Sequence, residues 1–223
     1  MCRLFWGELN IVKISEMILD VSLPKPRASY HHGNLEAALI ATATTMVRAH
    51  GAEHLSLRAV AAEVGVSPSA AYHYYPDKDS LISGVGQALF ESLADMQEAA
   101  LSRFPANSAK GARARFRALG RAYCDWARAE PNLFRLMFGG FCSLDFSDAQ
   151  IKRQETRAWN LLCECLDDLQ RHGAIDLKIR PFGEILAWST VHGATSLIVE
   201  GHLPIDSFET VLDGLELSLG IGK

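Results

Sequence analysis

The sequence lacks a strong excess of charge of either sign. Its 223 residues contain 22 Lys and Arg against 26 Asp and Glu, which gives a formal net charge of -4 at pH 7. Proteins that coat nucleic acid or an anionic membrane through bulk electrostatics carry a large positive charge, so that class is excluded. Any contact with nucleic acid must therefore be confined to a local surface.

Long apolar runs and a cysteine framework are also missing. The first two dozen residues are rich in apolar side chains, but Glu8, Lys13, Glu16 and Asp20 interrupt them before they reach the length of a signal or membrane-spanning segment. We interpret residues 1–26 as a flexible N-terminal extension. The five cysteines are odd in number and scattered, which predicts reduced thiols in a cytoplasmic protein.

Strand patterns and catalytic motifs are absent as well. No segment alternates apolar and polar residues between turn signals in the way that predicts a strand. The sequence has no glycine-rich phosphate-binding loop and no Ser, His and Asp set, so we expect no enzyme activity, no catalytic residue and no cofactor. Cys163 and Cys165 would point about 200° apart on a helix, so we expect no metal site there.

Helical periodicity is the dominant pattern in the sequence. Apolar residues recur every three or four positions, and caps and breakers divide them into about nine helices joined by short loops. The sequence therefore predicts an all-α fold. The helices are expected at about residues 34–51, 57–64, 68–75, 77–104, 110–129, 131–138, 147–172, 181–201 and 205–220.

One stretch combines turn signals with an aromatic cluster. Residues 57–81 read LRAVAAEVGVSPSAAYHYYPDKDSL, in which Gly65 ends one short helix and Ser67 with Pro68 begins the next. Two helices joined in this way have the size of a helix-turn-helix, whose second helix enters the DNA major groove. An aromatic cluster on a helix is more often core, but its place directly after this turn favours a DNA-reading surface with Tyr75 turned inward.

The same stretch resembles the N-terminal pattern of the Tet repressor (TetR) family of bacterial transcriptional regulators. The resemblance covers residues 30–85, including the lead-in YHHGNL, and implies a helix-turn-helix DNA-binding domain at 27–80. Since Lys and Arg are balanced by Asp and Glu in this region, the affinity for DNA would depend on Lys25, Arg27 and the histidines. The positions that the family would place on double-stranded operator DNA are Ser56, Arg58, Ser67, Ser69, Ala70, Tyr72, His73, Tyr74 and Lys78.

The remainder of the chain, residues 81–223, resembles the effector-binding and dimerisation domain of this family. The segment WSTVHGATSLIVEG looks like that of a subgroup marked by Trp, His and Gly. Side chains of this domain that could line a pocket for a small, mainly apolar or aromatic effector are Trp126, Phe134, Met137, Phe138, Trp159, Trp188 and His192. Individually such residues are more often core, and His192 is either the polar anchor of the effector or a core histidine with its hydrogen bonds satisfied.

The resemblance also implies a homodimer. The two last helices expected, 181–201 and 205–220, would form a four-helix bundle with their copies, burying Leu186, Ala194, Leu197, Phe208, Leu212 and Leu215. The prediction is thus a ligand-released repressor that binds a palindromic operator and no membrane. Two alternatives stay open: a helical small-molecule-binding protein or enzyme that has lost DNA binding, and a membrane-surface protein that uses the N-terminal apolar stretch.

Overall fold

Turn and cap residues divide the chain into helices close to the predicted positions. The computed structural model describes residues 35–139 and 156–222, and within these ranges it contains nine α-helices, two short 3-10 helices and no strand. The prediction of an all-α fold is confirmed. The predicted extension, the phosphate contacts of Lys25 and Arg27 and the first turns of the helix expected at 147–172 lie outside the described residues.

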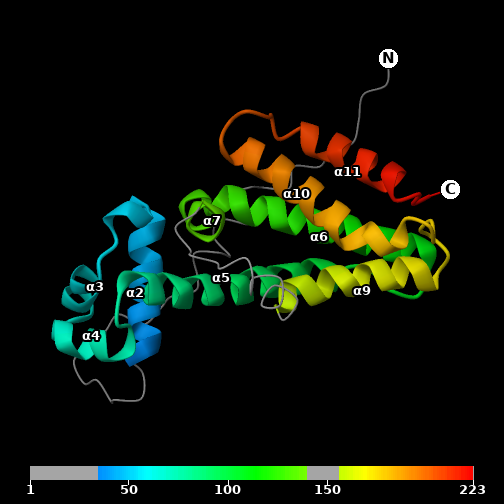
Figure 1. Cartoon of the computed structure of the whole chain (residues 1–223). Helices are drawn as coiled ribbons and strands as arrows, with labels where there is room; N and C mark the ends of the chain where they lie inside the picture. Colours follow the sequence, from blue (N-terminus) through cyan, green and yellow to red (C-terminus); the bar gives the residue numbers. More distant parts are fainter. Residues whose placement is uncertain (1–34, 140–155, 223) are drawn as a thin grey trace. The chain divides into compact units, whose positions relative to one another are not determined.

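Three helices pack together at the start of the described chain (Figure 1). They are α2 (Leu35–His50), α3 (Leu57–Val64) and α4 (Pro68–Tyr74), with the 3-10 helix η1 (Ala52–His54) between the first two. Every fourth residue of α2 faces inward, since Leu35, Leu39, Ala43 and Val47 are all buried. This apolar stripe is the surface on which α3 and the start of α5 pack.

The connection from α3 to α4 is built from a glycine and two serine caps. The hydroxyl oxygens of Ser56 and Ser67 accept hydrogen bonds from backbone N–H groups in the first turns of the two helices, each at 3.2 Å. Gly65 ends α3 with φ at 83°, in the left-handed region that residues with a Cβ rarely adopt. Pro68 begins α4, where its missing N–H costs no helical hydrogen bond. Local backbone chemistry therefore fixes the helix-turn-helix.

The long helix α5 (Lys78–Leu101) contacts both α2 and the C-terminal helices. Asp77 and Ser80 form a reciprocal capping box at its start. The predicted domain boundary after residue 80 falls inside α5, and the apolar core is continuous across it: Leu81 and Ile82 belong to the same buried cluster as residues of α2 and α7 (Pro131–Phe138).

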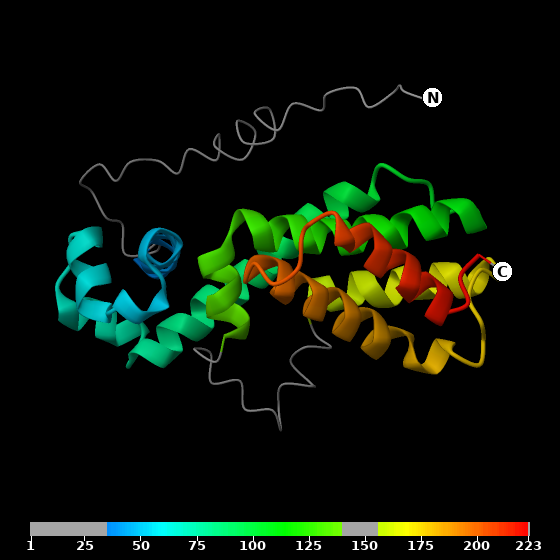
Figure 2. The ribbon, with the colours of Figure 1, turned by 90° about the horizontal axis from the view of Figure 1, so that it is seen from above.

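Four helices make up most of the rest of the described chain. They are α6 (Ala109–Ala129), α9 (Arg157–Arg171), α10 (Gly183–Val199), which follows the 3-10 helix η2 (Arg180–Phe182), and α11 (Ser207–Ser218). Helix α6 packs against α5, α9 and α10, and α10 lies beside α11 (Figures 1 and 2). Within the described ranges, none of the helices combines the length and apolarity needed to cross a membrane.

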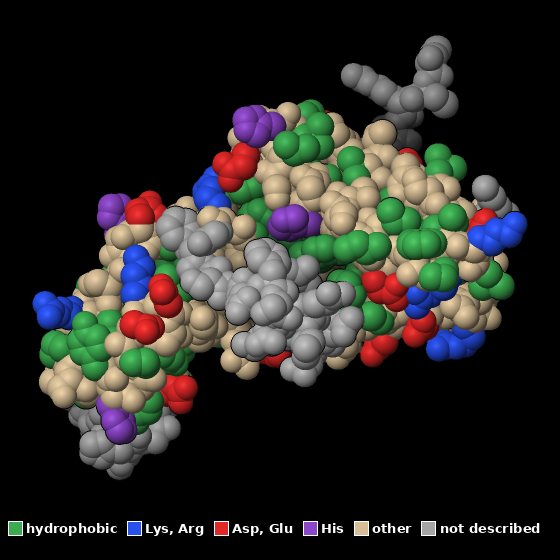
Figure 3. Space-filling model, viewed as in Figure 1, with side chains coloured by type: hydrophobic (Ala, Val, Ile, Leu, Met, Phe, Trp, Pro, Cys, Tyr) green, Lys and Arg blue, Asp and Glu red, His purple; other side chains and the backbone are tan. Residues whose placement is uncertain are grey.

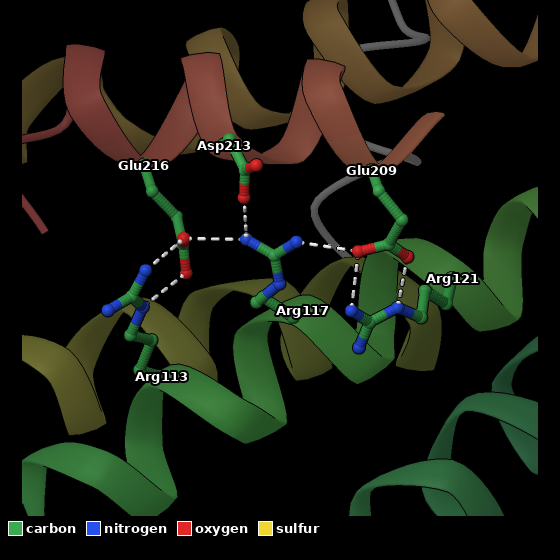
Figure 4. Close-up of polar contacts among 6 residues, drawn as sticks. All are labelled: Arg113, Arg117, Arg121, Glu209, Asp213 and Glu216. Carbon is green, nitrogen blue, oxygen red and sulfur yellow. Dashed lines mark hydrogen bonds and ion pairs between the residues drawn. The ribbon is translucent and has the colours of Figure 1, made fainter. Parts of the chain in front are cut away.

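A ladder of ion pairs joins α6 to α11 (Figure 4). Its members are Arg113, Arg117 and Arg121 on α6 and Glu209, Asp213 and Glu216 on α11. Arginines four residues apart lie on one face of a helix, so each can reach a carboxylate on the facing helix. Arg117 bridges the ladder, donating to Asp213 and Glu216 at 2.7 Å and to Glu209 at 2.6 Å.

Most of the residues expected in a subunit interface pack inside the chain instead. Ala194, Phe208, Leu212 and Leu215 are all buried by contacts within the protein, so this part of the prediction is wrong. The reason is that α6 runs beside α10 and α11 and takes up their inner faces: at Gly120 of α6, a Cβ atom would lie 3.1 Å from a methyl group of Leu212. Of the six residues, Leu186 and Leu197 remain exposed on α10.

Candidate nucleic-acid interface and effector cavity

The aromatic residues of α4 divide between the surface and the core. Tyr72 is 43% exposed and Tyr74 is 36% exposed, and His73, whose ring meets that of Tyr74 edge-on, is exposed as well. Ala71 and Tyr75 are buried, as the sequence predicts for Tyr75. The Tyr75 hydroxyl donates a hydrogen bond to Glu36 at 3.4 Å, and burial raises its pKa. The outward face of α4 therefore presents aromatic rings that carry hydrogen-bonding groups, and α4 contains no Lys, Arg, Asp or Glu.

The serines around this face can still donate hydrogen bonds. Ser56 and Ser67 use only their hydroxyl oxygens in capping, so the O–H groups can still donate to a phosphate oxygen. Ser69 is exposed on α4, whereas Ala70 is half-buried. In the view of Figure 3, the surface over α3 and α4 carries mainly hydrophobic and uncharged side chains with few Lys or Arg.

The cations of this region differ in their surroundings. Arg58 is exposed on α3 and forms no ion pair within residues 35–139 and 156–222. Lys78, which the sequence predicts on a phosphate, is half-buried and donates to the backbone carbonyl of Ala52 at 2.9 Å. Arg48 pairs with Glu130 at 2.9 Å. Arg58 is thus the cation of this group that is available for a phosphate without giving up a contact.

A cavity of about 50 Å³ lies among α5, α6, α9, α10 and α11. Aromatic and aliphatic side chains dominate its walls, and among residues 35–139 and 156–222 none that lines it is Asp, Glu, Lys or Arg. The lining consists of Phe90, Leu93, Gln97, Phe116, Leu119, Gly120, Tyr123, Thr156, Ala158, Trp159, Leu162, Ala187, Trp188, Val191, Leu212 and Leu215. Such a wall suits a small uncharged ligand.

The predicted effector residues are only partly at this cavity. Trp159 and Trp188 line it, whereas Trp126, Phe134, Met137, Phe138 and His192 do not. Trp126, Phe134 and Met137 are buried core residues, and Phe138 is half-buried beside them. Apolar stripes on helices usually serve as core, and here they do so without opening into the cavity.

His192 is part of an aromatic cluster that borders the cavity. Its Nδ1 lies 2.8 Å from the Tyr123 hydroxyl, and its ring stacks on Trp188 with centroids 5.2 Å apart. Phe134 and Phe138 of α7 complete the cluster around the imidazole. The contact with Tyr123 gives one ring nitrogen a hydrogen-bonding partner, and the imidazole is half-buried.

Sequence reasoning missed a polar residue in the cavity wall. Gln97 of α5 is only 5% exposed, and its side-chain oxygen has no hydrogen-bond partner within the described residues. The signal was present in the sequence: Leu89, Leu93, Gln97 and Leu101 recur every four residues, so the glutamine occupies a buried position of the α5 stripe.

The two cysteines of α9 lie in surroundings that disfavour the thiolate form. Cys163 and Cys165 lie on α9, and burial raises the pKa of the Cys165 thiol to about 12. Metal ligation needs the thiolate, which this environment disfavours. Among the described residues, no group of three His, Cys, Asp or Glu side chains is arranged to hold a metal ion.

Comparison with known proteins assigns both halves of the chain to one family. Residues 39–85 match the model of bacterial regulatory proteins of the tetR family, and residues 116–215 match that of the Tetracyclin repressor-like C-terminal domain. The chain belongs to the TetR family. The N-terminal match covers most of α2 together with α3 and α4, and the C-terminal match includes α7, α9 and α10.

Individual relatives share a low sequence identity with this chain. The nucleoid occlusion factor SlmA of Pasteurella multocida is 32% identical over 115 residues, which is 50% of this chain and 53% of that protein. An HTH-type transcriptional regulator of Mycobacterium tuberculosis, Rv1816, is 30% identical over 105 residues, 47% of this chain and 44% of the relative. The matches therefore span about half the length of these curated relatives.

A solved structure extends the likeness to most of the fold. The structure of a protein with unknown function from Rhodococcus sp. RHA1 aligns with a TM-score of 0.67 and 27% identity. The alignment covers 88% of this chain and 100% of that chain. The arrangement of the helices over most of this chain is thus also found in a solved structure.

Proposed function

We propose that the protein is a transcriptional regulator that binds operator DNA as a homodimer and is released by a small effector. The observation that carries the proposal is the outward face of α4: Tyr72, His73 and Tyr74 are exposed directly after a glycine turn and two serine caps. Hydroxyl and imidazole groups on such a helix can reach base edges in the major groove, while the serine hydroxyls contact phosphates.

Dimerisation is proposed through the outer surface of α10 and α11. Ile185 is 55% exposed, Leu186 37% and Leu197 48%, which is unusual for aliphatic side chains of one helix. At Gly193 of α10 and Gly214 of α11, a Cβ atom would meet nothing within 4 Å, so these faces have room for a close helix approach. In the view of Figure 3, hydrophobic side chains reach the surface over α10.

The proposed release mechanism is a population shift carried by α5. The N-terminal end of this helix packs on α2, and the turn that carries Gln97 lines the cavity. A ligand that fits better when α5 is displaced would favour the displaced state. Two recognition helices of a dimer must match successive major grooves about 34 Å apart, so a small displacement in each subunit would weaken operator binding.

Two finer assignments belong to the proposal. Membership of the subgroup marked by Trp188, His192 and Gly193 is supported by the placement of the first two in one stacked pair on α10. A cytoplasmic location follows from the proposed contact with the operator.

The scarcity of cations around α4 favours a second candidate, a helical small-molecule-binding protein without DNA binding.

The test is binding to DNA that flanks the protein's own gene, measured by fluorescence anisotropy. Tyr72→Ala should weaken binding by about 1–3 kcal/mol, since it removes a base-edge contact without touching the core. Phe104→Ala is the matched control, because Phe104 is 36% exposed but lies after the end of α5. A wild-type protein that binds no such DNA would favour the second candidate. A Tyr72 variant that binds as tightly as the control would show that the outward face of α4 does not contact the bases.

A further inference from the structure

The walls of the cavity contain a buried polar group whose hydrogen bonding is incomplete. Gln97 is 5% exposed, and its Oε1 atom accepts no hydrogen bond in the described part of the chain. Leaving a buried amide acceptor unpaired destabilises the fold, because the oxygen has lost its hydrogen bonds to water without replacement. A leucine at this position of α5 would continue the stripe of Leu89, Leu93 and Leu101 without that cost. The glutamine therefore lowers the stability of the ligand-free protein.

Other polar groups of the lining already have contacts. The Tyr123 hydroxyl bonds His192 at 2.8 Å, and the Thr156 hydroxyl oxygen accepts from the backbone N–H of Trp159 at 3.3 Å. None of the described lining residues is charged. The unmet acceptor of Gln97 is thus the group in the described lining that a ligand would satisfy.

We propose that Gln97 recognises a hydroxyl group on a neutral, otherwise apolar ligand held in this cavity. The amide offers a carbonyl oxygen and an NH₂ group, and a hydroxyl can donate to the first and accept from the second. A hydroxyl therefore fits whichever way the amide is turned. The inference deepens the proposed function by naming the chemical class of the effector, and its regulatory meaning rests on that function.

The chemistry of the wall excludes a carboxylate. An anion would lose its hydration in an apolar site whose described lining offers no cation, and this desolvation costs far more than one hydrogen bond returns. A pure hydrocarbon would enter more easily but would leave the Gln97 amide unpaired. An alcohol or phenol is the class that satisfies both the apolar wall and the single amide.

The size of the cavity adds a requirement for movement. At about 50 Å³ the cavity is smaller than the roughly 150 Å³ that holds a benzene ring, so a phenol must displace part of the wall. Phe90, Trp159 and Trp188 are half-buried wall residues, so an outward rotation of one of these side chains would enlarge the cavity. Ligand entry would thereby displace α5, which carries Phe90 and Gln97.

Three probes of similar shape test the proposal by calorimetry on the full chain: 4-methylphenol, p-xylene and 4-methylbenzoate. The wild-type protein should bind 4-methylphenol most tightly and 4-methylbenzoate not at all. Gln97→Leu should bind 4-methylphenol about tenfold more weakly and p-xylene at least as well as the wild type. Gln87→Leu is the matched control, because Gln87 is exposed on the same helix and does not line the cavity.

A second measurement separates recognition from a purely structural role. Without ligand, Gln97→Leu should raise Tm by about 2–4 °C, since it removes an unpaired buried amide. A lowered Tm would mean that the amide is satisfied within the fold and would overturn the proposal. So would equal binding of 4-methylphenol and p-xylene by the wild type, or binding of none of the three probes. Release of operator DNA by 4-methylphenol is scored separately, because its failure would count against the proposed function alone.

Discussion

Arg58 and Lys78 have the same charge but different surroundings. The Lys78 ammonium holds the carbonyl of Ala52 at 2.9 Å and so ties η1 to the start of α5. A variant of Lys78 would lose stability together with any phosphate contact, so it cannot isolate DNA binding. Arg58 is exposed and has no ion-pair partner within the described residues, which makes it the cleaner probe of phosphate binding.

We predict that Arg58→Ala weakens operator binding without destabilising the fold. Loss of one phosphate contact should lower the slope of log affinity against log salt by about one unit. The free energy of unfolding should change by no more than about 0.5 kcal/mol, as expected for an exposed residue. Affinities measured by anisotropy over a series of salt concentrations check this.

Arg103→Ala is the control for Arg58→Ala, because Arg103 is exposed after the end of α5 and its loss changes the net charge equally. Its salt slope should match that of the wild type. If both variants shift the slope by the same amount, net charge rather than a contact at Arg58 governs the affinity, and the placement of α3 on the DNA backbone is wrong.

At the scale of elements, the ion-pair ladder sets how firmly α11 is held to α6. The side chain of Glu209 accepts hydrogen bonds from Arg121 and Arg117, and these hold its pKa at about 2 instead of the ordinary 4.5. A lowered carboxyl pKa means that the folded state prefers the charged form. The stabilisation is therefore complete above about pH 4.5 and is lost as the pH falls toward 2.

We predict that Glu209→Gln destabilises the protein by about 1 kcal/mol at pH 7, the upper end for a half-exposed pair. The difference in free energy of unfolding from the wild type should shrink as the pH falls from 4.5 to 2, measured by urea denaturation at each pH. Glu164→Gln, at an exposed position of α9 with no ion pair in the described structure, should show no such trend. A difference that stays constant with pH would contradict the assigned role of the carboxylate.

Helix positions were predictable because their signals are local. Ser56, Gly65, Ser67 and Pro68 act within one or two turns, so the sequence locates α3 and α4 nearly to the residue. The cavity is a different case, because its walls come from five helices distant in sequence. Periodicity identifies apolar stripes but does not tell which of them leave a cavity between them. The sequence therefore predicts Trp126 and Phe134 in a pocket although they lie in the core.

The location of the subunit interface is also hard to predict from the sequence. The sequence predicts that α10 and α11 are apolar, but an apolar residue can face either α6 or a partner. Leu212 faces inward because Gly120 allows α6 to approach it closely, and no short-range pattern encodes that approach. On α10, Ile185, Leu186 and Leu197 stay exposed, which is why the proposed interface uses this surface.

For the whole molecule, the proposed dimer makes operator binding depend on the outer surface of α10. Leu197→Glu would place a charge where two copies of the same helix approach each other. Burying an unpaired carboxylate costs several kcal/mol, and the two-fold arrangement repeats the charge in both subunits. We predict a dimer dissociation constant raised at least 100-fold, measured by sedimentation, with each subunit still folded by circular dichroism.

The same variant links assembly to function. Because two recognition helices on successive major grooves bind cooperatively, the Leu197→Glu protein should also lose most of its operator affinity although residue 197 is remote in sequence from α3 and α4. Phe104→Glu introduces the same charge at another exposed apolar position and should leave both the dimer and the operator affinity unchanged. A dimer that survives Leu197→Glu but dissociates with Phe104→Glu would move the interface from α10 to the end of α5. A monomeric Leu197→Glu protein with wild-type operator affinity would instead show that a single helix-turn-helix is sufficient for binding.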